Sequence, residues 1–180
     1  MDVASEKFDV EGIELSNWSA DLAATNHLVH RVPLSALHFI TKYDGITLFG
    51  VIEHFHDPRL EIAAAFQSLR PGGFLFIYTG DRNAFLPRLL KKKWWWYQGM
   101  HLQYFSKSSL RKLIEQTGFA YVDSRRFPLF FSLNSLSSSM NRYPLLKPMS
   151  AILSSRLFKS VHLRISISGE MMLIAQKPAS

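Results

Sequence analysis

Apolar and polar positions alternate along the chain in blocks that predict strands and helices in turn. The runs Phe8–Leu15, Tyr43–Ile52 and Phe74–Thr79 are short and mostly apolar, which is typical of strands buried on both faces of a sheet. The segments between them are longer, and their apolar positions recur at helical spacing. This order of elements predicts an α/β fold, a doubly wound domain with a mostly parallel sheet.

Capping and turn residues mark where the predicted helices begin and end. Asp57 and Pro58 open the helix after the second apolar run, and the turn Pro71-Gly72-Gly73 ends it. Ser106 opens a later helix over SKSSLRKLIEQTGF, and Gly118 ends that helix. Further strands are predicted at FAYVDSRRF and GEMMLIAQKP, with a short edge strand in HLVHRVPL.

Length and composition predict a single domain over residues 1–180, with a Rossmann-like part at 8–126, an insertion at 127–166 and a last strand at 167–178. The absence of cysteine excludes a disulfide framework and thiolate metal sites, and it favours a cytoplasmic location. The polar, acidic start is unlike a secretory signal. No charge-free run of 18 apolar residues suggests a membrane-spanning helix.

Charge is unevenly distributed between the two halves of the sequence. Residues 1–80 contain five Lys/Arg and ten Asp/Glu, whereas residues 81–180 contain sixteen and four, so the net charges are −5 and +12. The basic half is either a solvated surface or a surface that faces an anionic partner.

The segment KKKWWWYQGMHLQYF carries the strongest substrate signal. Lys91, Lys92 and Lys93 beside Trp94, Trp95 and Trp96 suit a peripheral contact with a bilayer interface, and they equally suit stacking on a nucleic acid. A third interpretation is a lid whose aromatic rings pack on the domain itself. The later stretches FPLFFSLNSL and YPLLKPMSAILSSRLFKSVHL predict apolar helices with interspersed basic residues, which favours lipid over nucleic acid. Such helices could equally wall a pocket for an apolar tail or cap an active site.

Several short motifs follow one another along the chain. They are an aspartate that opens an apolar strand, Glu-His and Asp-Pro pairs after it, a Pro-Gly-Gly turn and a His-x-x-Tyr-Phe-Ser segment, at Asp44, Glu53-His54, Asp57-Pro58, Pro71-Gly72-Gly73 and 101–106. In this order and spacing they resemble the motifs of class I S-adenosylmethionine-dependent methyltransferases, in the group of the ubiquinone-biosynthesis O-methyltransferases. The resemblance covers residues 8–125 and the strand at 169–177.

The resemblance implies S-adenosyl-L-methionine as the cofactor. It implies that Glu14, with Leu15 beside it, binds both ribose hydroxyls, because a carboxylate has paired acceptor atoms. It also places Gly50, Val51 and Glu53 around the cofactor. Without the resemblance, Glu14 has a plainer interpretation, in which it caps the following helix or faces solvent.

Two histidines are the candidates for a catalytic base. The resemblance puts His54 at the open carboxyl end of a strand and His101 in a loop that covers the substrate, and methyl transfer to a hydroxyl benefits from a base there. A hydrogen bond at a helix entry is the structural alternative for His54. Relatives that use a divalent metal carry an extra acid just before Glu-His. Because Phe49 and Gly50 stand in that region, no metal site is predicted.

The glycines depart from the family pattern. None of the nine forms a G-x-G, and residues 1–7 are too few for the family's first strand, glycine-rich turn and helix. The chain therefore looks truncated at its N-terminus relative to the family, and the absent strand would leave two strand edges unpaired. Two hypotheses follow: a methyltransferase acting on the hydroxyl of a small or lipid-linked acceptor, or a non-catalytic remnant that serves as a binding or membrane-associated module.

Overall fold

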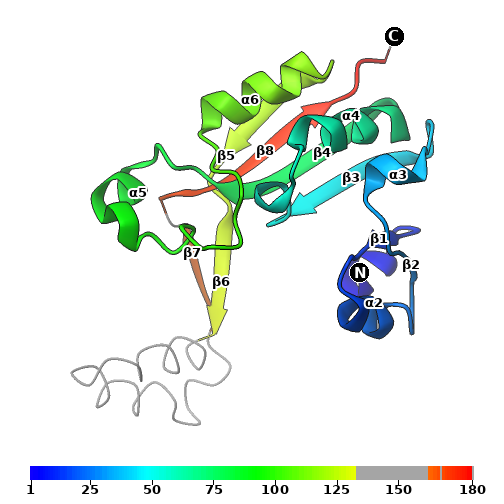
Figure 1. The fold of residues 1–180 in the computed structure, drawn as a ribbon, viewed down its shortest axis with the longest axis horizontal. Coiled ribbons are helices and arrows are strands. Elements are labelled where there is room, and N and C mark those ends of the chain that lie inside the picture. The colour runs from blue at the N-terminus through cyan, green and yellow to red at the C-terminus, as the bar shows by residue number, and fades with distance from the viewer. Residues whose placement is uncertain (133–161, 167, 180) are drawn as a thin grey trace.

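The computed structural model describes residues 1–132, 162–166 and 168–179 (Figure 1). Short helices and strands alternate through most of this length. In chain order the elements are α1 (Asp2–Ser5), β1 (Glu11–Ile13), α2 (Asn17–Ala23), β2 (Leu28–His30), α3 (Leu34–Leu37), β3 (Tyr43–Phe49), the 3₁₀ turn η1 (Ile52–His54), α4 (Pro58–Ser68), β4 (Leu69–Gly80), α5 (Phe85–Leu90), the 3₁₀ turn η2 (Lys91–Lys93), α6 (Lys107–Gln116), β5 (Ala120–Arg125), β6 (Pro128–Ser132), β7 (His162–Ser166) and β8 (Glu170–Gln176).

The main sheet has four strands in the order β3-β4-β8-β5. β3 and β4 are parallel, and β8 pairs antiparallel with both β4 and β5. Three strands therefore run in one direction and only the last strand of the chain opposes them. The predicted α/β class and the mostly parallel sheet are confirmed.

The core lies between this sheet and two helices. Ile62 and Ala65 of α4 and Leu110 of α6 pack against inward-facing sheet residues such as Ile77 and Leu173, all fully buried. The starts of both helices agree with their capping signals, because Asp57 accepts a hydrogen bond from the Leu60 amide and Ser106 forms a capping box with Ser109. The turn Pro71-Gly72-Gly73, which was predicted to end the first of these helices, lies inside β4 instead, because α4 ends at Ser68 and the chain continues directly as a strand. Local capping chemistry therefore placed the start of each core helix.

The strands of this sheet are less buried than predicted. Phe49 and Phe74 are 49% and 36% exposed, although their runs were expected to be covered on both faces. The core helices α4 and α6 pack on one face of the sheet, and these two side chains project from the other. An apolar run signals a strand, but it does not show how many of its faces are covered.

A second, smaller sheet carries the N-terminal part of the chain. β1 and β2 pair in parallel, and no pairing joins either strand to β3 within the described residues. In Figure 1 this N-terminal unit lies beside α3, whereas α5 lies at the opposite side of the main sheet. The unit is tied to the start of β3 by Glu11, whose carboxylate accepts hydrogen bonds from Lys42 and Tyr43.

The insertion begins and ends as strands. β6 and β7 form an antiparallel pair in which Pro128 is opposite Ser166 and Ser132 is opposite His162. The prediction of a helix over FPLFFSLNSL is therefore wrong for residues 128–132, where adjacent aromatic residues favour an extended strand. The helix predicted over YPLLKPMSAILSSRLFKSVHL is likewise wrong at its end, because residues 162–166 form β7. Residues 133–161 of the predicted insertion lie outside the described residues. Among the helices that the structure describes, none is long and apolar enough to cross a bilayer.

Candidate functional site

The carboxyl end of β3 turns sharply into η1 at Gly50. Gly50 has φ +62°, a left-handed conformation that glycine adopts without strain, and its amide donates a hydrogen bond to the carbonyl of Tyr78. A Cβ at this position would lie 3.5 Å from a carboxylate oxygen of Glu53. The turn therefore brings Gly50 and Glu53, two of the residues predicted around the cofactor, to one place. Val51 lies between them and is exposed.

Glu53 joins this turn to the aromatic segment, which we define as residues 94–104. Its carboxylate is buried and accepts a 2.9 Å hydrogen bond from the Thr79 hydroxyl. Its main-chain carbonyl accepts hydrogen bonds from the amides of Leu102 and Gln103, at 2.8 and 3.0 Å. A buried carboxylate is costly unless hydrogen-bonded, so the pairing with Thr79 helps to hold Glu53 in place.

The two predicted catalytic histidines meet in this region. The ring centroids of His54 and His101 are 4.7 Å apart, in an edge-to-face arrangement. Nδ1 of His54 is 3.1 Å from the carbonyl oxygen of Met100, and Nδ1 of His101 is 2.7 Å from that of Trp96. A carbonyl can only accept, so each Nδ1 carries a proton and Nε2 of each neutral ring keeps its lone pair. Both histidines are therefore in the tautomer that can accept a proton through Nε2.

The same histidines form a cluster with Glu53. A carboxylate oxygen of Glu53 and one ring nitrogen from each of His54 and His101 all lie within 4.8 Å of one another. Oxygen and imidazole nitrogen ligands of this kind can hold a divalent cation. The prediction that the chain has no metal site stays a prediction, and these three residues are where it can be tested.

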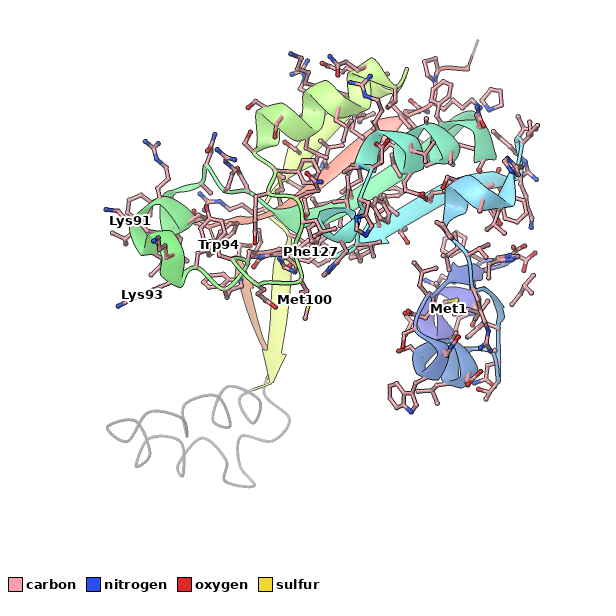
Figure 2. The ribbon with its side chains drawn as sticks, in the orientation of Figure 1. Met1, Lys91, Lys93, Trp94, Met100 and Phe127 are labelled. Carbon is pink, nitrogen blue, oxygen red and sulfur yellow. The ribbon has the colours of Figure 1, made fainter. Side chains whose placement is uncertain are left out.

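The lysines and the tryptophans of the basic aromatic run, residues 91–96, differ in exposure. Lys91, Lys92 and Lys93 are exposed, whereas Trp94 and Trp96 are buried against the backbone of Gly80. Figure 2 shows the two labelled lysines pointing outward from the green helix, with Trp94 toward the sheet. The interpretation of all three tryptophans as interface residues is therefore wrong for these two. Their rings pack on the domain itself, as the lid alternative requires.

Glu170 helps to hold the residues around the histidine pair, although the sequence did not point to it. It is the first residue of β8 and is only 3% exposed. Its carboxylate accepts hydrogen bonds from Tyr78, Trp95 and Trp96. Burial and the neighbouring carboxylate of Glu170 raise the pKa of Tyr78 well above its usual range. An acid inside the apolar strand GEMMLIAQ was the available signal, because buried acids are rare without partners.

Glu14 and Leu15 lie in the N-terminal unit, apart from this cluster. One carboxylate oxygen of Glu14 accepts a 2.8 Å hydrogen bond from the Ser16 amide, at the start of α2. Leu15 is exposed. Glu14 thus makes a local contact beside α2, a helix whose N-cap residue is Ser16 and which has no side-chain cap, and no hydrogen bond within the described residues links Glu14 to Gly50 or Glu53.

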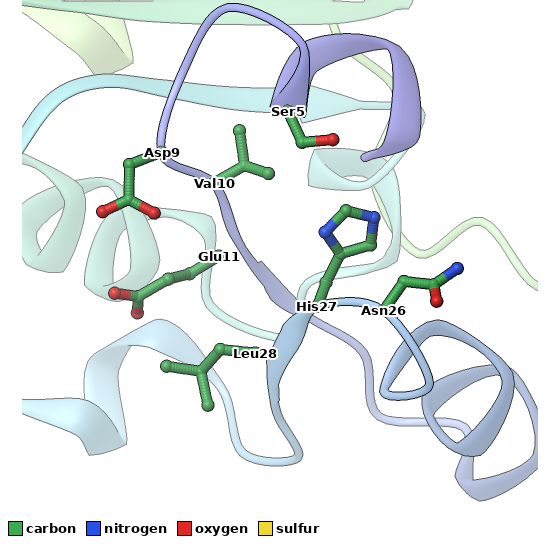
Figure 3. A pocket seen from close by; sticks show the side chains of 7 residues that line it. All are labelled: Ser5, Asp9, Val10, Glu11, Asn26, His27 and Leu28. Atoms are coloured by element: carbon green, nitrogen blue, oxygen red, sulfur yellow. The ribbon is translucent and has the colours of Figure 1, made fainter.

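The N-terminal unit has an open hollow of its own (Figure 3). Its lining residues are Ser5, Asp9, Val10, Glu11, Asn26, His27 and Leu28. Hydrogen bonds from Lys42, then His30 and Tyr43, lower the pKa of Glu11 from 4.5 to about 2. The most strongly bonded acid of the N-terminal unit is therefore Glu11, whose role is to attach this unit to β3.

A mostly parallel α/β sheet with a histidine pair at the carboxyl end of one strand defines a class of fold rather than a reaction. The family is shown by the sequence: residues 2–124 match the family model of the methyltransferase domain, and the chain belongs to that family. The resemblance to methyltransferases is thereby confirmed.

Curated relatives are ubiquinone biosynthesis O-methyltransferases. The protein of Cronobacter sakazakii is 36% identical over 59 residues, which are 33% of this chain and 24% of that protein. The protein of Photorhabdus laumondii is 28% identical over 101 residues, which are 51% of this chain and 39% of that protein. The matches thus span well under half of the length of these relatives.

Solved structures share the fold at low identity. A SAM-dependent methyltransferase from Archaeoglobus fulgidus has a TM-score of 0.66 at 14% identity, covering 98% of this chain and 80% of that one. The Burkholderia thailandensis 1,6-didemethyltoxoflavin-N1-methyltransferase, with bound S-adenosylhomocysteine, has a TM-score of 0.56 at 17% identity, covering 97% and 63%. The [4+2]-cyclase SpnF scores 0.65 at 15% identity, covering 99% and 70%. The fold therefore carries more than one reaction, and the reaction has to be argued from the site.

Proposed function

We propose that this protein is an S-adenosyl-L-methionine-dependent methyltransferase that methylates the hydroxyl of a small or lipid-linked acceptor. The observation that carries the proposal is the pair His54 and His101, each held with Nδ1 protonated and Nε2 available. Gly50 and Glu53 lie beside the pair, where the resemblance to methyltransferases expects the cofactor. When bound, the cofactor supplies an electrophilic methyl group.

The residues of the chain then have separate tasks. Nε2 of His54 or His101 accepts the proton of the acceptor hydroxyl, which makes the oxygen a better nucleophile. The aromatic segment covers the site and limits the access of water. Glu14 binds the ribose hydroxyls of the cofactor through its carboxylate. Alignment of the two reacting groups supplies most of the rate.

The cofactor site is tested by calorimetric titration of the chain with S-adenosylhomocysteine. We expect a micromolar dissociation constant, which corresponds to about −8 kcal/mol. Glu14→Ala is expected to weaken binding by about tenfold or more, because hydrogen bonds to a charged group contribute about 1.5–3 kcal/mol. The matched control is Glu6→Ala, an exposed acid of the same unit, which should leave the affinity unchanged. Equal affinities for the two variants would remove Glu14 from the site.

A second candidate function is a methyltransferase fold that no longer binds the cofactor and acts as a binding or membrane-associated module. One observation favours it: β1, which leads to Glu14, and β3, which leads to Gly50, belong to separate sheets. The titration distinguishes the two functions. A folded wild-type chain without affinity for S-adenosylhomocysteine supports the module and excludes the enzyme.

We also propose a cytoplasmic location with a peripheral contact to membranes, through a surface that differs from the predicted one. Trp94 and Trp96 are buried and Trp95 is 41% exposed, so the most exposed apolar side chains beside Lys91–Lys93 are Phe85 and Leu89, at 73% and 63%. These two are four residues apart on α5 and share one face. Apolar side chains next to lysines suit a bilayer surface that contains anionic lipid.

Vesicle co-sedimentation tests this contact. The wild-type chain should bind vesicles of phosphatidylcholine mixed with phosphatidylglycerol, and bind pure phosphatidylcholine weakly. Exchange of Phe85 and Leu89 for serine should reduce binding by about tenfold or more, because each buried side chain contributes about 1.5–3 kcal/mol. The same exchange at Leu22, which is exposed on α2, is the control. Unchanged binding of the double variant would contradict the assignment of α5.

A further inference from the structure

The buried carboxylate of Glu170 has three neutral donors around it. Oε2 accepts a 2.6 Å hydrogen bond from the Tyr78 hydroxyl, and Oε1 accepts 2.9 Å bonds from the indole nitrogens of Trp95 and Trp96. No ion pair with Glu170 occurs among residues 1–132, 162–166 and 168–179. A buried carboxylate is tolerated where hydrogen bonds replace water, and here two of its three donors belong to the aromatic segment.

The backbone around Glu170 leaves room for these rings. A Cβ at Gly80, which is directly opposite Glu170 in the β4–β8 pairing, would lie 2.8 Å from atoms of both Trp94 and Trp96. Gly169 precedes Glu170 with φ +113°, and a Cβ there would lie 2.9 Å from Pro87. Glycine at both positions lets the aromatic segment lie directly against the strands, within reach of the carboxylate.

Trp96 connects the Glu170 carboxylate to the histidine pair. Its indole nitrogen donates to Glu170, and its main-chain carbonyl accepts the Nδ1 proton of His101 at 2.7 Å. The rings of Trp96 and His101 have centroids 5.4 Å apart, and His101 in turn lies against His54. The position of the Trp96 carbonyl therefore decides both the orientation and the tautomer of the His101 imidazole.

We propose that Glu170 is a positioning residue: its carboxylate anchors Trp95 and Trp96, and through the Trp96 carbonyl it keeps His101 with Nε2 free beside His54. Glu170 acts through Trp96 and does not touch the reacting groups. The catalytic meaning of this role rests on the proposed function. The positioning itself is a property of the folded chain and needs neither cofactor nor turnover.

The test is NMR of the full chain labelled with ¹⁵N, comparing wild type with Glu170→Gln. A carboxylate is a stronger acceptor than an amide, so the indole N–H signals of Trp95 and Trp96 should move upfield in the variant, while that of Trp18 stays in place. The ¹⁵N shifts of Nδ1 and Nε2 in His101 should move toward each other, because the single tautomer is lost. The control is Glu115→Gln, which removes an exposed acid paired with Arg111 and should leave all these signals unchanged.

A second variant keeps the proposal testable if Glu170→Gln does not fold. Trp96→Phe retains an aromatic ring and the main-chain carbonyl but removes the donor to Glu170, and it should also loosen the His101 tautomer. If His101 keeps its wild-type nitrogen shifts when the anchor is removed, Glu170 is a local structural residue and the proposal is wrong. A failure of the proposed function is separate, because it appears as absent binding of S-adenosylhomocysteine by the wild-type chain.

Discussion

Exchange of Trp94 for alanine is expected to lower the free energy of unfolding by about 3–5 kcal/mol, the usual cost of removing a buried tryptophan. Trp94 is only 2% exposed, and its ring contacts the backbone of Gly80 and the rings of Trp95, Trp96 and Tyr97. Its indole nitrogen has no hydrogen-bond partner within the described residues, so no hydrogen bond is lost and the cost should fall in the lower part of that range. Urea denaturation, followed by far-UV circular dichroism, measures this difference.

The matched control is Trp18→Ala on α2. Trp18 is 76% exposed, and exposed substitutions usually change stability by less than about 0.5 kcal/mol. The comparison separates the two roles considered for residues 91–96, a buried lid and a contact with a bilayer. A tryptophan that contacts a bilayer is exposed in water and therefore contributes little to the stability of the fold. A Trp94 variant as stable as the Trp18 variant would contradict the buried lid and restore the interface interpretation of the sequence.

Exchange of Glu11 for glutamine is expected to lower the stability of the N-terminal unit by about 2 kcal/mol at neutral pH. Hydrogen bonds, from Lys42 first and then from His30 and Tyr43, lower the pKa of Glu11 from 4.5 to about 2. The full shift corresponds to about 3 kcal/mol, and solvent screening around the partly exposed Lys42 reduces the figure. Amide hydrogen exchange at Glu14, whose N–H donates to the carbonyl of His30, reports the opening of this unit.

The pH dependence of the same contact has a definite sign. Because folding depresses the pKa of Glu11, its contribution is fully present above pH 4.5 and is lost as the pH falls through about 2. Wild type and Glu11→Gln should therefore differ at neutral pH and converge in acid. Glu6→Gln, which changes an exposed acid, should follow the wild-type curve throughout. A constant difference between wild type and Glu11→Gln over this range would show that the contact is not ionic.

The secondary structure could be predicted because its signals are local. Asp57 and Ser106 cap the helices that they precede in the sequence, and the apolar runs at 43–52 and 74–79 contain β3 and much of β4. The order of short motifs was enough to identify the methyltransferase domain, now matched over residues 2–124. The short strand β2, in HLVHRVPL, was also predicted. The alternation of hydrophobicity did not show that β1 and β3 belong to different sheets, because pairing depends on the neighbouring strands.

Only part of the candidate site could be predicted from the sequence. His54 and His101 were predicted as separate candidates, and their direct contact follows from the return of the aromatic segment to the Glu53 carbonyl. Glu14 was predicted from the resemblance, and its role in cofactor binding stays a prediction that the titration will test. Glu170 was overlooked, because its partner Tyr78 is 92 positions away and no spacing rule connects them.

The sequence by itself determined the strands of the main sheet, the starts of α4 and α6 and the family, since these depend mostly on residues within a few positions of one another. Only the tertiary structure decided which tryptophans are buried, which acid anchors them and how the two imidazoles are held. Adjacent tryptophans in KKKWWW have the same local signal, yet Trp95 is 41% exposed and Trp94 is 2% exposed. The physical reason is that burial and hydrogen bonding depend on contacts between distant strands, here the approach of Gly80 and Glu170 in the β4–β8 pairing.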